Sequence, residues 1–556
     1  MKRNKLIYGA ASLLTVAMMT GCSDNYLELA PEVNPTPELL MSTIETARYA
    51  INGLGRLQSS QYLSTQGYSG EGGMVVWYGE FPGNDMVHNR WNSTWYVYAN
   101  FTWQQSSDMK ISAYAWIYNY KMIANANVII NNIDNAEGTE KVKETRKFIK
   151  AQALTYRANA YLWLVQTYSK RWCDSKNGQT RGVVIRLGDE PDDLECSTVA
   201  ETYAQIYSDL DQAITLFTES GMDRDSGSSN VWLPNLEVAH AVYARAALVR
   251  EDWATANTHA ELAIKNHPLM TSAQYREGFN TANDEWIWMA YNDLEQTLSY
   301  YGPFAYLASN STASVTRGYG NIISKQLIDQ IPEEDTRRWL YGIPQEGDDN
   351  KINTTSKPGN ITAGGLLDRY KDEYYDRYNH ENTMTYYAYA VMKFLRAEGI
   401  ADGCFVLYRA AEMYYTRAEA LYELGREDEA RKILIEAVKP YQENYDCTLS
   451  GEALRDEIRL YRRFDLLGEG HNFYDFKRWK LPVTRLDWEN GGTWPKVFCG
   501  DGTNGGSGGN FGPNDKNNWC VVIPDEELNF NKYVNYAAEP DNWTKGFEVS
   551  NSSSDE

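Results

Sequence analysis

The strongest helical signal in the chain is residues 150–168, which read KAQALTYRANAYLWLVQTY. Its apolar side chains recur at intervals of three and four residues: Ala151, Leu154, Ala158, Tyr161, Val165 and Tyr168. This spacing places them on one face of an amphipathic helix. Such a helix cannot bury its apolar face alone, so the stretch predicts a scaffold of stacked helices around it.

Further helices are predicted on both sides of this stretch. Residues 116–133 have a helical pattern, and Thr198 and Glu201 have the spacing of a capping box that opens another helix. Residues 239–263 and 418–437 each predict two alanine-rich helices joined by a short turn. Small residues let paired helices pack closely, as in tetratricopeptide repeats. The predicted fold class is therefore mainly α, with tetratricopeptide-like helix pairs.

Long segments rich in Gly, Asn, Ser, Thr and aromatic residues separate the predicted helices. They are residues 59–104, 282–321, 342–363 and 490–518. Loops this long in a compact chain usually carry function. We therefore expect a helical scaffold that presents a large, irregular, aromatic-lined surface.

The composition limits the classes of ligand. The 556 residues include 53 Lys and Arg against 75 Asp and Glu, which gives a formal net charge of −22. No Lys- or Arg-rich stripe offsets this charge, so nucleic acid is not an expected partner. The chain holds 41 Tyr and 17 Trp. An acidic, polar chain rich in these aromatics is typical of an exported protein that meets neutral polar ligands.

The N-terminus predicts export and a lipid anchor. Three basic residues within the first five precede a 14-residue apolar stretch, residues 6–19. This is too short for a transmembrane helix, which needs roughly 20 residues, and fits a signal sequence. Residues 19–22, MTGC, resemble a bacterial lipobox, so Cys22 is the predicted lipidation site; an ordinary signal peptide is the alternative. An acidic start follows Cys22, like the export signal of surface lipoproteins.

Six cysteines remain if Cys22 is acylated. An even number in an exported protein permits disulfides. By position, Cys499 with Cys520 and Cys173 with Cys196 are the plausible pairs. Buried free thiols are an equally good interpretation of either pair.

Five sequence blocks together resemble the SusD/RagB family. They occur in the family's order: residues 116–127, 150–168, 407–420, 462–479 and 523–528. With the lipobox, the resemblance covers nearly the whole mature chain. Two positions depart from the family's pattern: Asn472 stands where Arg is frequent, and Gly468 interrupts a usually apolar position.

The resemblance implies an outer-membrane lipoprotein that faces the cell exterior and is built on four tetratricopeptide-like helix pairs. Family members capture glycans, or in some cases peptides, and act with a SusC-like TonB-dependent transporter; they are not enzymes and need no cofactor. We therefore divide the chain into a signal peptide (1–21), a lipidated tether (22–35) and one SusD-like domain (36–550). The helical scaffold is expected mainly in 110–268 and 405–480, and the loop-rich ligand face mainly in 59–104 and 282–321.

The predicted glycan site lies on these loops. Aromatic rings bury the C–H faces of sugars, while polar side chains bind the hydroxyls. Trp91 and Tyr319 stand where the resemblance places ligand-facing aromatics, and Tyr301 completes the predicted stacking platform. Trp95, Tyr300 and Tyr306 are further candidates. The predicted hydroxyl partners are Asn84, Asp85, Asn89 and Arg317. The alternative for each aromatic is packing on the scaffold.

Catalysis is the competing hypothesis. A glycoside hydrolase needs two carboxylates at a defined separation, which composition alone leaves open. A charged cluster in residues 462–478 suggests such a site, but the spacing of Asp475 and Arg478 favours structural ion pairs. The six histidines show no zinc-ligand spacing, and His240 is predicted to pack between helices. Residues 223–227, DRDSG, begin like a calcium loop but lack its bidentate Glu, so no metal site is predicted.

Overall fold

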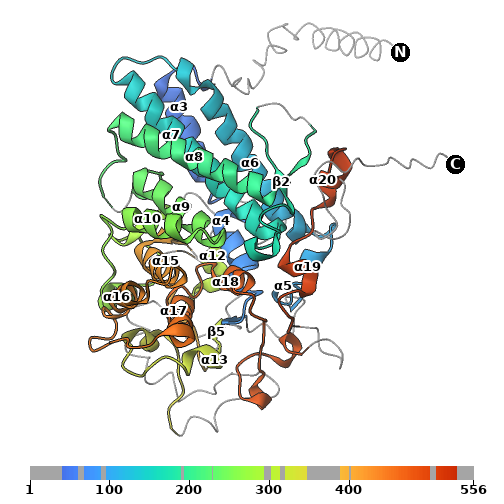
Figure 1. The fold of residues 1–556 in the computed structure, drawn as a ribbon, viewed down its shortest axis with the longest axis vertical. Coiled ribbons are helices and arrows are strands. Elements are labelled where there is room, and N and C mark those ends of the chain that lie inside the picture. The colour runs from blue at the N-terminus through green and yellow to red at the C-terminus, as the bar shows by residue number, and fades with distance from the viewer. Residues whose placement is uncertain are drawn as a thin grey trace, which may run out of the picture.

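The protein is mainly helical, as the sequence predicts (Figure 1). The computed structural model describes residues 40–60, 68–88, 96–188, 193–227, 230–292, 302–313, 320–346, 388–397, 399, 402–500 and 509–534. The predicted signal peptide, Cys22 and the tether lie outside these residues. Within the described ranges, no helix combines the length and apolar character that crossing a membrane requires.

Four long helices lie side by side at one end of the molecule (Figure 1). They are α3 (Ile44–Leu57), α6 (Lys110–Asn132), α7 (Val142–Tyr168) and α8 (Val199–Ser220). The predicted capping box is confirmed at the start of α8: the Thr198 hydroxyl accepts the backbone N–H of Glu201, and the Glu201 carboxylate accepts the N–H of Thr198.

Helix α7 is buried around its whole circumference from residue 151 to 165, and not only on the predicted apolar face. The reason is its central position, because α3, α6, α8 and α9 (Leu236–Val249) all contact it. Its polar side chains therefore need internal partners. Arg157 forms a bidentate ion pair with Asp209 of α8, at 2.6 and 2.8 Å, and Asn159 binds the carboxylate of Glu71.

The two predicted helix pairs are present. Helix α9 pairs with α10 (Trp253–Ala263), and α15 (Ala410–Glu423) pairs with α16 (Glu427–Val438). The alanines between them are fully buried, as close packing requires. His240 packs between α9 and α10, where its Nδ1 lies 2.9 Å from Nδ1 of His259, so its predicted packing role is confirmed. Two further helices, α17 (Gly451–Asp465) and α18 (Asn472–Arg478), complete this half.

Three two-stranded antiparallel sheets connect the helices. They are β1 (Met86–Val87) with β5 (Ile322–Ile323), β2 (Arg181–Val184) with β3 (Cys196–Thr198), and β4 (Trp286–Ala290) with β6 (Phe405–Arg409). Strand β4 lies within the predicted loop-rich segment 282–321. Its five residues are all buried, so this short apolar run is a core strand and not part of an irregular surface.

The remaining elements are short. The helices are α4 (Gly70–Met74), α5 (Tyr96–Ala99), α11 (Ser272–Tyr275), α12 (Pro303–Leu307), α13 (Lys325–Ile328), α19 (Asp515–Trp519) and α20 (Asp525–Phe530). The 3-10 turns are η3 (Trp103–Gln105), η4 (Ile133–Asn135), η5 (Trp172–Asp174), η7 (Thr336–Leu340), η9 (Trp488–Asn490) and η10 (Lys496–Phe498), and η2 (Val75–Glu80) is a π-helix.

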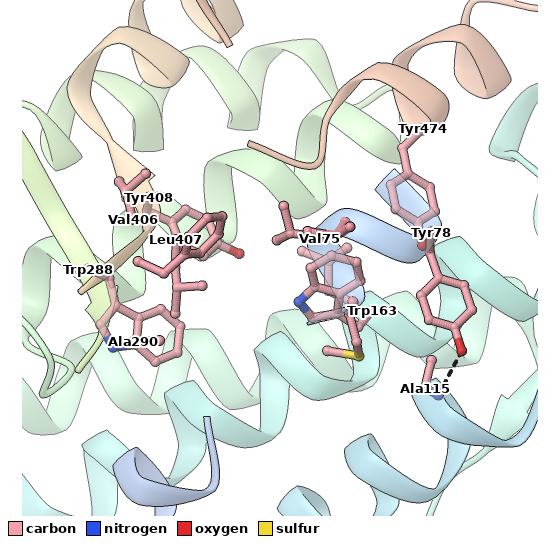
Figure 2. Close-up of a cluster of buried hydrophobic side chains, with 14 of the residues drawn as sticks. Val75, Tyr78, Ala115, Trp163, Trp288, Ala290, Val406, Leu407, Tyr408 and Tyr474 are labelled. Atoms are coloured by element: carbon pink, nitrogen blue, oxygen red, sulfur yellow. Dashed lines mark hydrogen bonds between the residues drawn. The ribbon is translucent and has the colours of Figure 1, made fainter. Parts of the chain in front are cut away.

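The main core joins the helical half to the strands (Figure 2). Trp288 of β4 stacks near Tyr408 of β6, with ring centroids 5.8 Å apart, while Trp163 of α7 contacts Tyr474 of α18. Figure 2 also shows Tyr78 of η2, whose hydroxyl accepts the backbone N–H of Ala115 in α6. The π-helix is therefore fixed directly to the scaffold.

Candidate functional site

The two loops that carry Trp91 and Tyr319 start and end beside one another. Strands β1 and β5 pair Met86 with Ile323 and Val87 with Ile322. The chain enters residues 89–95 from His88 and leaves residues 314–319 just before Asn321. Nδ1 of His88 lies 3.2 Å from Oδ1 of Asn321, so a hydrogen bond ties the two loop ends together.

The loop that carries Tyr300 and Tyr301 ends at the same place. It leads into α12, where the backbone oxygen of Tyr306 accepts a hydrogen bond from Asn321 Nδ2 at 2.5 Å. The ring of Tyr306 packs edge-on against Trp77 of η2, with centroids 5.0 Å apart. Asn321 therefore links one end of each of the three predicted loops.

Aromatic rings form the buried floor of this region. The ring of Trp77 also contacts Phe81 at 5.4 Å and Tyr98 at 4.9 Å, and Phe81 stacks on His88 at 4.7 Å. Trp77 belongs to a π-helix, a rare conformation that is frequent at functional sites. We define the loop base as strands β1 and β5 together with the residues Trp77, Phe81, Asn84, Asp85, His88, Tyr98, Tyr306, Asn321 and Asn472.

Three predicted site residues belong to this base and not to a ligand surface. Asp85 is fully buried, and both of its carboxylate oxygens bind the guanidinium of Arg463, at 2.7 and 2.8 Å. Asn84 is also buried, and its Oδ1 accepts the backbone N–H of Thr484 at 3.0 Å. Tyr306 is 1% exposed. The structure therefore corrects their assignment, because their contacts are used inside the fold.

The other predicted site residues lie outside the described residues. They are Asn89, Trp91, Trp95, Tyr300, Tyr301, Arg317 and Tyr319. The structure describes only the ends of their loops. Sequence reasoning missed the residues that bring these ends together, above all His88 and Asn321. The sequence offers only a weak indication of their role. His88 and Asn321 each stand next to two consecutive apolar residues, and two residues are too few to be recognised as a strand.

Asn472, which stands where the family frequently has Arg, has a defined role in this structure. Its Nδ2 donates to the Asp85 carboxylate, and its Oδ1 accepts the backbone N–H of Asn84 at 2.7 Å. The neighbouring Gly83 leaves no space for a Cβ, since the Asn472 side chain would lie 2.1 Å from it. Asn472 thus holds the segment that leads into the Trp91 loop.

A buried ion-pair network lies next to the loop base. Arg409, at the end of β6, binds Glu285, Asp465 and Glu469 at 2.7–2.8 Å. Burial alone would raise the pKa of Asp465, but Arg409 and Arg337 outweigh it and lower that pKa to about 2. Lys393 adds a bond to Glu469 at 2.5 Å. The network connects strands β4 and β6 to the turn between α17 and α18.

The charged cluster in residues 462–478 is structural as well. The predicted ion pair between Asp475 and Arg478 is confirmed at 2.8 Å, and Asp475 also binds Arg462 at 2.7 Å. Arg478 extends to Glu419, whose pKa falls to about 2 because the guanidinium outweighs the effect of burial. A carboxylate held in this way is a poor general acid or base at neutral pH.

Glu80 is a buried carboxyl group near the loop base whose pKa is raised by burial, as is that of Glu285 in the network. Glu80 is fully buried at the end of η2, and burial raises its pKa to about 8 although the backbone N–H of Gly470 donates to Oε1 at 2.7 Å. Among the described residues, Oε2 has no hydrogen-bond partner. The side chain is therefore largely protonated at pH 7.

A small hollow beside α18 is too small for a sugar. It measures about 20 Å³ and is lined by Glu71, Arg245, Tyr408 and His471, among others. A volume of this size holds a water molecule. We therefore treat it as part of the scaffold.

The cysteines and carboxylates form no disulfide or metal site in the described part of the chain. All six described cysteines are free thiols, so neither predicted disulfide is present. The alternative of buried free thiols holds for Cys196, Cys447, Cys499 and Cys520, whereas Cys173 is exposed and Cys404 is partly buried. No group of three or more His, Cys, Asp or Glu side chains is arranged to hold a metal ion within the ranges that the structure describes.

Two models of known protein families match the chain. A family model described as "Starch-binding associating with outer membrane" matches residues 68–248, and the SusD family model matches residues 265–555. No curated protein matches the chain.

Several solved structures share the fold. A SusD-like carbohydrate-binding protein from Bacteroides vulgatus is 23% identical, with 90% of this chain and 98% of that chain covered and a TM-score of 0.70. A SusD superfamily protein from Bacteroides thetaiotaomicron is 19% identical, with coverage of 89% and 99% and a TM-score of 0.67. Surface glycan-binding protein A from the same species, solved with laminarihexaose, is 16% identical, with coverage of 88% and 98% and a TM-score of 0.61.

These likenesses agree with the order of elements and with the confirmed helix pairs. The SusD family model alone spans more than half of the 556 residues. The chain therefore belongs to the SusD/RagB family.

Proposed function

We propose that the protein is a cell-surface glycan-binding lipoprotein that captures oligo- or polysaccharide and delivers it to a SusC-like TonB-dependent transporter, without catalysis of its own. One observation carries the proposal: the three loops with the predicted sugar-stacking aromatics begin or end at a single, tightly bonded base. Family membership supports it, as does the relative that was solved with laminarihexaose.

The proposed platform consists of Trp91, Tyr301 and Tyr319, with Trp95 and Tyr300 beside it. Because Asn84 and Asp85 are buried, Asn89 and Arg317 are the remaining candidates for binding the sugar hydroxyls. An aromatic face covers the apolar C–H surface of a sugar ring, while amide and guanidinium groups bind its hydroxyls. Each aromatic contributes about 1–3 kcal/mol to binding, the scale for burying a large apolar side chain.

The test is a triple variant, Trp91→Ala with Tyr301→Ala and Tyr319→Ala. A glycan array that also carries peptides identifies the ligand of the parent protein, and calorimetry then measures the affinity of the variant. We expect binding to be lost. The matched control is Tyr49→Ala with Phe530→Ala, which removes two exposed aromatics from α3 and α20 and leaves affinity unchanged. Full affinity in a folded triple variant would refute the platform.

The proposed location follows from residues 1–35, with cleavage before Cys22 and acylation of that residue. Multiple acyl chains anchor a protein stably, whereas a single chain does so only marginally. Cys22→Ala should leave the protein uncleaved or release it from the outer membrane. Unchanged membrane fractionation of this variant would contradict the anchor. For the partner, purification from solubilised outer membranes should recover a β-barrel transporter with the full chain.

A further inference from the structure

A surface hollow of about 320 Å³ lies at the start of β4, at the opposite end of that strand from the loop that carries Tyr301. Its lining includes Gln274, Glu277, Phe279, Thr281, Asn283 and Trp286. A second hollow of about 220 Å³ adjoins it and shares Asn283 and Trp286. Ligand pockets begin at about 300 Å³, so the larger hollow fits a small ligand.

The lining combines an aromatic floor with unused polar groups. Phe279 and Trp286 are buried, while Gln274, Glu277 and Asn283 reach the solvent. Oε1 of Gln274 accepts the backbone N–H of Thr271, and Oδ1 of Asn283 accepts that of Glu285. Neither amide NH₂ group has an acceptor among the described residues. Within the described residues, the Glu277 carboxylate makes no ion pair. The hollow therefore offers donors and an acceptor together.

The indole N–H of Trp286 is an independent sign of a missing partner. Trp286 is 1% exposed and lines both hollows, yet its Nε1 has no hydrogen-bond acceptor among the described residues. Buried polar groups in folded proteins are nearly always hydrogen-bonded. Several other buried indoles follow this rule: Trp288 donates to the backbone oxygen of Trp232 at 3.0 Å, and Trp519 donates to that of Gly512 at 2.8 Å. A ligand oxygen that entered the hollow would supply the missing acceptor.

The charged residues that line the two hollows indicate which class of ligand the larger hollow can bind. Among the described residues that line the larger hollow there is no Lys or Arg. In the smaller one, Asp223, Asp225 and Asp284 accompany Arg224, whose guanidinium is already bound to two backbone oxygens at 3.0 Å. Phosphate and carboxylate ligands are therefore disfavoured. A neutral polyol suits the site, because its hydroxyls both donate and accept and its C–H face covers an aromatic ring.

We propose that this hollow binds one neutral sugar residue, as a second carbohydrate site separate from the loop platform. The class of ligand rests on the proposed glycan-binding function, whereas the location rests only on the described residues. A glycan chain held at this second site would be present at a high local concentration near the platform. This would raise the overall affinity of the protein for a long glycan.

The test is ¹⁹F NMR of the full domain labelled with 5-fluorotryptophan. The probes are the methyl glycosides of glucose, galactose and mannose, together with N-acetylglucosamine. The Trp286 signal is assigned by its absence from the Trp286→Phe spectrum, and the other indole signals report on the fold. We expect at least one sugar to shift the Trp286 signal with a Kd of about 1–50 mM, the range of weak single-residue binding. No shift with any of the sugars at about 100 mM would overturn the proposal.

Two variants check that the response comes from the hollow. Glu277→Ala with Asn283→Ala removes the available carboxylate and amide, and Thr281→Arg fills the hollow from an exposed position. Both should abolish the shift; a shift of unchanged size in either variant would overturn the assignment. These variants also keep the test valid if Trp286→Phe fails to fold, because the Trp286 signal is then identified as the one whose sugar-induced shift disappears in both variants.

The triple platform variant separates this inference from the proposed function. It should lose binding to the long glycan and keep the Trp286 shift, and loss of the shift would show that the hollow is not a separate site. A shift in the parent protein without any long-glycan binding would refute the platform and leave the hollow supported. Long-glycan binding without a shift would refute the hollow alone.

Discussion

The helical scaffold and the loop base differ in how far apart along the chain their contacting residues lie. In the scaffold, consecutive helices pack on one another: α6 on α7, α7 on α8, α9 on α10, and α15 on α16. In the loop base, Met86 pairs with Ile323, and Asp85 binds Arg463 at a separation of 378 residues. The scaffold can form from local units, whereas the base requires the whole chain to be folded.

The two regions also differ in what holds them together. Buried alanines and aliphatic side chains dominate the contacts between the paired helices. In the loop base, single polar side chains such as Asp85, Asn321 and Asn472 bind carboxylate, guanidinium or backbone groups of distant segments. A buried charged or amide group is costly to leave unpaired. We therefore expect polar substitutions in the base to affect stability and ligand binding together.

The largest effect is expected where the two regions meet, at Arg409. Replacing it in Arg409→Met leaves Glu285, Asp465 and Glu469 buried with one balancing charge fewer. Removing one partner of a buried ion pair costs about 3–5 kcal/mol, so we expect a loss of at least this size in urea denaturation. The control is Arg417→Met, whose partner Glu261 is largely exposed; it should cost less than about 1 kcal/mol. Equal losses in the two variants would contradict the role of the network.

A matched pair of aspartates separates stability from binding. Asp209 in the scaffold and Asp85 in the loop base are both fully buried, and each forms a bidentate pair with an arginine. Asp209→Asn and Asp85→Asn should each lower the free energy of unfolding by about 2–4 kcal/mol. Calorimetry with the glycan should show weaker binding only for Asp85→Asn. Equal affinities in the two folded variants would mean that the base does not position the loops.

The contrast between the regions also explains how far the sequence could be interpreted. The helix pairs, the capping box at Thr198 and the ion pair of Asp475 with Arg478 depend on residues a few positions apart, and all were predictable. The burial of Asn84, Asp85 and Tyr306 was not, because their partners are hundreds of residues away. A polar residue beside an aromatic one suggests a sugar site equally well whether it faces solvent or a buried arginine.

The π-helix and strand β4 show a second limit of sequence reasoning. The residues of η2 look like an irregular aromatic loop, yet all six are buried. Strand β4 is only five residues long, and periodicity alone cannot distinguish so short an apolar run from other structures. Both elements depend on tertiary packing against α6, α12 and β6.

Glu80 provides a test of the base that depends on pH. Its pKa rises from 4.5 to about 8 on folding, so the unfolded chain releases this proton more readily. The side chain therefore destabilises the fold increasingly as the pH rises from 4.5 to 8. Glu80→Gln should be more stable than the parent by about 1–3 kcal/mol at pH 7, and the difference should vanish near pH 4. Thermal unfolding across this range checks the sign; a difference independent of pH would contradict the raised pKa.

The smallest effects on the free energy of unfolding are expected for two variants, one in each region. Thr198→Ala removes the capping hydroxyl of α8 and should cost about 1 kcal/mol of stability. Asn321→Ala removes two hydrogen bonds, one to His88 and one to the backbone of Tyr306, and at about 1 kcal/mol each their loss should cost about 2 kcal/mol. Since Asn321 joins one end of each of the three loops, its variant should also bind the glycan several-fold more weakly. Thr198→Ala should bind normally. Calorimetry on both folded proteins decides whether loop position, and not overall stability, controls affinity, because the two variants should differ by only about 1 kcal/mol in stability. An equally weakened affinity in Thr198→Ala would show that stability alone explains the loss.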